Sequence, residues 1–96
     1  MGGSLNEHNL AVEVRISGIV QGVGFRYWAW SLANELGVHG WVRNDPDGDV
    51  LAQLEGPEPA IATMLKRLHN GPRFARVTQV ETVEGTFRGL PDFSMK

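Results

Sequence analysis

Between Ile16 and Arg26 the chain reads ISGIVQGVGFR, and here its hydrophobic pattern changes from that of a strand to that of a helix. Before this stretch, apolar and polar residues alternate over residues 10–18, which predicts a half-buried strand. After it, apolar residues recur at helical spacing over residues 25–36, and Gly37 stands where a helix cap is expected. The residues expected to be buried are Val12, Val14 and Ile16 in the strand, and Phe25, Ala29, Leu32, Ala33 and Leu36 in the helix.

A hairpin and a second helix are predicted next. Residues 38–44 and 49–55 read as strands, and the turn residues Asp45-Pro46-Asp47-Gly48 between them favour a hairpin. We interpret the aspartates of this turn as solvated residues. Residues 57–70 read as a helix, since prolines open it, basic residues lie near its end, and Gly71-Pro72 stop it. Its expected buried stripe is Ile61, Leu65 and Leu68.

The last third of the chain completes the fold prediction. Residues 74–83 read as a strand in which valines recur every three residues, and this spacing indicates a bulge. Residues 93–96 are expected to add a short edge strand. The order strand, helix, strand, strand, helix, strand (βαββαβ) is the split-βαβ, ferredoxin-like pattern, an α+β sandwich. We expect an antiparallel sheet with two helices on one face, forming a single domain over residues 10–96 after a flexible tail over residues 1–9.

Composition excludes several classes of function. The chain has 96 residues, enough for one core. Its net charge is −2, whereas domains that bind nucleic acid typically carry a basic surface. It contains no cysteine, and its three histidines fit no common zinc pattern, so we expect no metal. Because no apolar run approaches the length of a membrane span, we expect a cytoplasmic monomer that binds neither nucleic acid nor a membrane.

The glycine-rich loop between the first strand and the first helix is a candidate anion site. Glycines at 18, 22 and 24 let the backbone adopt positive φ, so that successive N–H groups can point at one ligand. The helix that follows adds its positive dipole end. The alternative is a tight connection without a ligand. No Gly-Lys-Ser/Thr follows the loop, which argues against nucleoside triphosphate binding.

Two polar residues beside this loop are candidates for chemistry. Arg26 lies in the first turn of the helix, where its charge opposes the dipole, and a bidentate contact with a bound phosphate would explain its position. The alternative is an exposed surface arginine. Asn44 ends the second strand, and its side chain could either orient a water molecule or cap the turn. Local sequence does not separate the two roles of Asn44.

Two motifs resemble the two signatures of the acylphosphatase family. Residues 16–26 resemble the first, an aliphatic residue followed by G-x-VQGV-x-FR. Gly40-Trp41-Val42-Arg43-Asn44 resembles the second, with Gly48, Val50 and Gly56 at the right intervals. Together the motifs cover most of residues 16–56. The family's carboxyl-terminal pattern differs, because an aliphatic-Arg-Tyr ending is replaced here by Met95-Lys96, which leaves open the length of the last strand and its contacts near Arg26.

The resemblance implies a ferredoxin-like enzyme that hydrolyses small-molecule acyl phosphates without a metal or cofactor, releasing a carboxylate and inorganic phosphate. Phosphate should also act as a competitive inhibitor. The resemblance places the catalytic roles on Arg26 and Asn44. The phosphate-binding residues that it implies are Gln21, Gly22, Val23, Gly24, Phe25 and Arg26. The alternatives are an auxiliary, non-catalytic acylphosphatase-like module and a ferredoxin-like RNA-binding domain.

Overall fold

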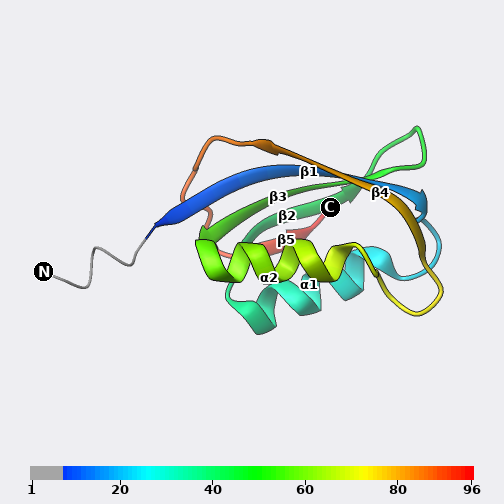
Figure 1. The fold of residues 1–96 in the computed structure, drawn as a ribbon, viewed down its shortest axis with the longest axis horizontal. Coiled ribbons are helices and arrows are strands. Elements are labelled where there is room, and N and C mark those ends of the chain that lie inside the picture. The colour runs from blue at the N-terminus through cyan, green and yellow to red at the C-terminus, as the bar shows by residue number, and fades with distance from the viewer. Residues whose placement is uncertain (1–7) are drawn as a thin grey trace, which may run out of the picture.

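The fold is that of a computed structural model in which residues 8–96 are described, so residues 1–7 of the expected tail lie outside the described residues. The elements are β1 (Asn9–Ile19), α1 (Phe25–Leu36), β2 (His39–Asn44), β3 (Val50–Pro57), α2 (Glu58–Leu68), β4 (Arg76–Glu84) and β5 (Phe93–Met95). β1 therefore begins one residue before the predicted start of the domain. Figure 1 shows the sheet as one layer and both helices as a second layer on one of its faces.

The sheet has the strand order β4-β1-β3-β2-β5. The first four strands are antiparallel as predicted, whereas β5 pairs with β2 in parallel, so the sheet is mixed. The expectation of a wholly antiparallel sheet is corrected by this strand. The reason lies in the connection, because the chain leaves β4 at one edge of the sheet, crosses to the other edge and returns in the direction of β2 (Figure 1).

The core lies between the sheet and the two helices. The predicted inner faces of β1 and α1 are confirmed, although Val12 and Leu36 lie at the margin of the core and are only partly buried. In α2 the buried side chains are Ile61, Met64 and Leu68, whereas Leu65 is only partly buried. The predicted stripe was therefore wrong at one position. Met64 and Leu68 follow Ile61 by three and seven positions and therefore share its face of the helix, whereas Leu65 lies at the margin of that face.

The bulge predicted for the last long strand is confirmed. The pairing of β1 with β4 shifts register between Ser17 and Gly18, which leaves Thr78 as an extra residue in β4. Val77 and Val80 on either side of it both pack against the core. Gly18 is required here, since a Cβ atom built on it would lie 2.1 Å from a carbonyl oxygen of β4. The three-residue spacing of Val77 and Val80 thus reflects one inserted residue, whereas Val83 is exposed.

A buried carboxylate holds the crossing segment between β4 and β5 against the sheet. Glu55 in β3 is only 2% exposed, and its carboxylate accepts hydrogen bonds from the backbone N–H groups of Arg88 (2.8 Å) and Leu90 (3.0 Å). The Gln53 side-chain amide donates both to this carboxylate (3.0 Å) and to the carbonyl oxygen of Thr86 (2.9 Å). Because these bonds fasten the crossing segment, they direct β5 to its place beside β2.

Glu55→Gln is expected to lower the free energy of unfolding by about 2 kcal/mol at pH 7, because an amide cannot accept from both N–H groups. Burial raises the pKa of the Glu55 carboxyl, but the hydrogen bonds from Leu90, Arg88 and Gln53 outweigh burial and lower it below the usual 4.5. Stability from a lowered pKa is complete above the unfolded-state pKa and is lost as pH falls through the folded-state pKa. The difference between wild type and variant should therefore shrink below about pH 4.5.

Urea unfolding of both proteins between pH 3 and 7 measures this difference. Glu35→Gln is the matched control, since Glu35 is exposed on α1 and its replacement should change stability by less than about 0.5 kcal/mol. A difference between wild type and Glu55→Gln that stays constant over this pH range would contradict the role given to the ionised carboxylate.

Candidate active site

The glycine-rich loop between β1 and α1 has the backbone conformation expected of an anion site. Gly22 and Gly24 have φ values of 75° and 78°, in the left-handed region that glycine adopts most readily. Gly24 is also the N-cap of α1, so no side chain caps this helix, and its first turn contains no acidic residue. The N–H groups at the start of the helix are thus available to a ligand.

A surface pocket of about 380 Å³ joins this loop to the end of β2. It is lined by Val20, Gly22, Gly24, Phe25, Arg26, Tyr27, Asn44 and Met95. The pocket brings together Arg26 and Asn44, which are far apart in sequence, with three of the predicted loop residues. Two other predicted loop residues, Gln21 and Val23, are not among the lining residues.

The side chain of Gln21 has a different partner from the one that its motif position suggested. Its amide Nε2 donates hydrogen bonds to the carbonyl oxygens of Asp45 (2.7 Å) and Asp49 (2.9 Å). These carbonyls belong to the hairpin turn that directly follows Asn44. Gln21 therefore fastens the loop to the turn, and only its backbone N–H can serve a ligand in the loop. No spacing in the sequence links Gln21 with the turn.

Arg26 is exposed, and one edge of its guanidinium group is anchored. Its Nη1 donates a hydrogen bond to the carbonyl oxygen of Lys96 (2.8 Å). The pairing of β5 with β2 continues to this residue, because the Lys96 N–H donates to the carbonyl oxygen of Val42 (2.9 Å). The length of the last strand and its contacts near Arg26 were open from the sequence. In the structure β5 is short, and the residue after it contacts Arg26.

The acidic hairpin turn is held by two arginines, which corrects the interpretation of its aspartates as solvated residues. Arg15 Nη1 lies 2.9 Å from carboxylate oxygens of both Asp47 and Asp49 and 4.0 Å from one of Asp45. Arg43 Nη1 lies 3.6 Å from Asp45. The N–H group of Asp49, together with Arg15, lowers the pKa of the Asp47 carboxyl. These contacts hold the shape of the turn beside Asn44.

Asn44 is half-buried at the end of β2 and pairs with Val50 in β3. The turn that follows is closed by its own residues, since the Asp49 N–H donates to an Asp47 carboxylate oxygen (2.9 Å) and the Asp45 N–H to the Asp49 carbonyl oxygen (2.8 Å). Within residues 8–96, the Asn44 side chain makes no hydrogen bond with the protein. Its amide in the pocket is thus free for a ligand or water, and it does not cap the turn.

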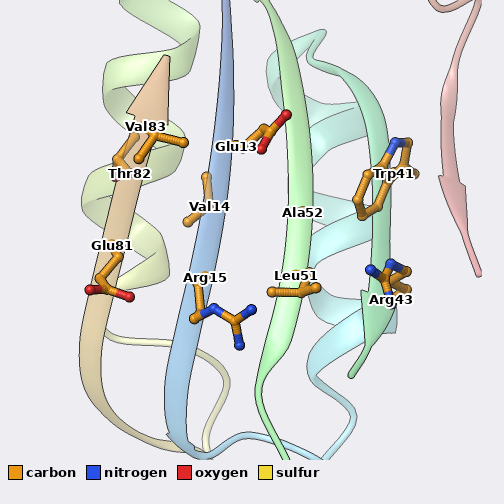
Figure 2. Close-up of a pocket in the computed structure, with 10 residues that line it drawn as sticks. All are labelled: Glu13, Val14, Arg15, Trp41, Arg43, Leu51, Ala52, Glu81, Thr82 and Val83. Atoms are coloured by element: carbon orange, nitrogen blue, oxygen red, sulfur yellow. The ribbon is translucent and has the colours of Figure 1, made fainter. Parts of the chain in front are cut away.

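A larger hollow of about 590 Å³ lies on the face of the sheet away from the helices. Figure 2 shows charged side chains of β1, β2 and β4 around it, with both helices behind the sheet. Its arginines, Arg15 and Arg43, are the ones that pair with the acidic turn. This hollow contains neither Arg26 nor Asn44 and lacks the glycine loop, so the pocket at the loop remains the candidate site.

Neither a metal centre nor a membrane span emerges from the described part of the chain. Over residues 8–96, no three histidine, aspartate or glutamate side chains are grouped so that they could hold a metal ion. None of the helices in the same range is long and apolar enough to cross a membrane. The polar groups that the described residues offer in the pocket include an arginine, an asparagine amide and backbone N–H groups, which suit an oxyanion.

Comparison with known proteins agrees with this chemistry. The family model described as Acylphosphatase matches residues 12–95. A protein named Acylphosphatase from Rhizobium etli is 51% identical over 87 residues, which cover 91% of this chain and 93% of that protein. A protein of the same name from Nocardioides sp. is 50% identical over 86 residues, which cover 90% of this chain and 87% of that protein. The crystal structure of acylphosphatase from Bacillus subtilis gives a TM-score of 0.88 at 36% identity, covering 91% of this chain and 98% of that one.

Proposed function

Because the chain belongs to the acylphosphatase family, we propose that Arg26 and the backbone N–H groups of residues 21–25 hold the phosphoryl group of its substrate, while Asn44 orients the attacking water. The chain is a hydrolase that cleaves the carboxyl–phosphate bond of acyl phosphates to a carboxylate and inorganic phosphate. The observation that carries the proposed roles is the pocket, in which Arg26, Asn44 and the loop glycines meet.

The phosphoryl group is held by directed donors. The left-handed conformation of Gly22 and Gly24 lets successive N–H groups of the loop point toward one ligand, and the start of α1 adds its positive dipole end. Arg26 has five N–H donors, and its bond to Lys96 uses one of them. The anchored guanidinium group can still give the phosphate two parallel hydrogen bonds, and anchoring reduces the entropy lost when it does so.

Asn44 positions a water in line with the phosphorus, on the side opposite the leaving carboxylate. Its amide can accept a hydrogen bond from the water and donate one to it or to a phosphate oxygen. Because a carboxylate is a good leaving group, positioning and charge stabilisation suffice, without a strong general acid or a metal. Among the described residues that line the pocket there is no aspartate, glutamate or histidine, so we propose that the proton of the water passes to the phosphate itself.

The remaining expectations are part of the same proposal: a cytoplasmic monomer that acts on a small molecule, without cofactor, nucleic acid or membrane. A net charge of −2 supports the absence of a nucleic-acid partner and weighs against the RNA-binding alternative. The auxiliary, non-catalytic module is disfavoured because both residues that the resemblance implicates in catalysis line the pocket.

Inorganic phosphate is expected to inhibit the hydrolysis of acetyl phosphate competitively and to raise the melting temperature, since it binds the folded protein only. At a phosphate concentration one hundred times its Kd, the stabilisation should reach about 2.7 kcal/mol. Initial rates and thermal scans, both recorded with a chelator present, give the inhibition constant and Kd, which should agree. Phosphate that stabilises the protein without competing with substrate would place the anion site outside this pocket.

A further inference from the structure

The candidate pocket has two walls that come from different elements. One wall is the edge of the sheet, where Asn44 ends β2 and Met95 of β5 lies beside β2 in register with Val42. The other wall is the glycine loop and the start of α1, which contributes Arg26 and Tyr27. The phosphoryl group proposed above lies between these walls.

Tyr27 is an exposed aromatic residue in this pocket. It directly follows Arg26 in α1, and its side of the helix is open, with the residue 64% exposed. Its ring lies 5.7 Å from the ring of Trp30, with an interplanar angle of 31°. Trp30 is partly buried against the core, so it supports the Tyr27 ring from one side. Tyr27 therefore offers a supported aromatic surface next to the proposed phosphate site.

In-line displacement determines on which side of the phosphoryl group the acyl group lies. The attacking water and the leaving oxygen occupy opposite sides of the phosphorus. Because the proposed function places the water beside Asn44, on the sheet wall, the acyl group must point toward the loop and helix wall. The phosphate oxygens occupy Arg26 and the loop N–H groups of that wall. Of the two aromatic residues that the wall contributes to the pocket, Phe25 is buried and Tyr27 is exposed, so Tyr27 is the one whose ring is open to the acyl group.

We infer that Tyr27 forms an acyl subsite, whose ring packs on the acyl group and selects acyl phosphates with an aromatic or larger apolar acyl group over acetyl phosphate. This inference rests on the proposed function, since the position of Asn44 sets the direction of the acyl group. An acetyl group is too small to cover much of the ring, whereas a benzoyl group can stack on it.

The test compares kcat/KM for benzoyl phosphate and acetyl phosphate in wild type, Tyr27→Ala and Tyr27→Phe. The intrinsic reactivities of the two substrates are the same in every variant and cancel when ratios are compared. We expect Tyr27→Ala to lower the benzoyl-to-acetyl ratio about tenfold, because benzoyl phosphate loses a contact with the ring that acetyl phosphate makes only to a small extent. Tyr27→Phe keeps the ring and should keep the ratio. Phe74→Ala is the matched control, because Phe74 is another exposed aromatic residue, 74% exposed, that does not line the pocket.

The outcomes separate this inference from the proposed function. A benzoyl-to-acetyl ratio that stays unchanged in Tyr27→Ala, whether or not activity falls equally with both substrates, would overturn the acyl subsite. It would leave the roles of Arg26 and Asn44 intact. A fall in the ratio caused by Met95→Ala but not by Tyr27→Ala would place the acyl group on the sheet wall and also overturn it. Failure of the proposed function has a different signature, which is wild-type turnover in Asn44→Ala.

Discussion

Arg26→Ala is expected to lower kcat/KM for acetyl phosphate by about a thousandfold, the lower end of the effect of arginines that stabilise phosphoryl transfer elsewhere. The physical reason is that Arg26 contacts the phosphoryl group both before and during the reaction. Its loss should therefore weaken phosphate binding and turnover together. Steady-state kinetics and phosphate titration of the folded variant measure the two effects.

Arg26→Lys sharpens this test. A lysine keeps the positive charge, but it cannot donate both to the carbonyl oxygen of Lys96 and, in parallel, to two phosphate oxygens. We therefore expect Arg26→Lys to recover only a small part of the lost activity. Arg73→Ala is the matched control, since Arg73 lies against the Phe74 ring, outside the pocket, and its loss should leave kcat unchanged. Near-normal activity in Arg26→Lys would show that charge alone suffices and that the bidentate contact is unnecessary.

Asn44→Ala is expected to lower kcat by about 100-fold, about 3 kcal/mol, while the affinity for phosphate stays nearly unchanged. The amide acts on the attacking water, which is not part of the phosphate complex. Because the side chain makes no hydrogen bond to the turn within residues 8–96, its loss should cost less than about 0.5 kcal/mol of stability.

Asp47→Ala provides the contrast for Asn44→Ala. The Asp47 carboxylate accepts from the Asp49 N–H and pairs with Arg15, so its removal should lower the melting temperature and leave kcat close to wild type. The two variants thus test different roles of one hairpin: Asn44→Ala tests its part in the reaction, and Asp47→Ala tests its part in stability. If Asn44→Ala kept wild-type turnover, the water-orienting role would be wrong.

Much of this architecture follows from local sequence. The elements between β1 and β4 were predictable because alternation, helical spacing and turn residues act over a few residues. The valine spacing of β4 revealed its bulge, and Gly37 marked the end of α1. The positions of Arg26 at the start of a helix and of Asn44 at the end of a strand were equally predictable, because both are defined by neighbours in the chain.

Tertiary structure alone decided the contacts that join distant segments. Nothing local indicates that Gln21 donates to the turn or that Glu55 holds the crossing segment. The parallel direction of β5 and the contact of Arg26 with Lys96 depend on that crossing, which carries the chain from one edge of the sheet to the other. The sequence by itself thus determined the elements and the residues at their ends, since short-range sterics and periodic burial govern them. Which ends meet was decided by the packing of the whole sheet, because those contacts form only after the chain has crossed it.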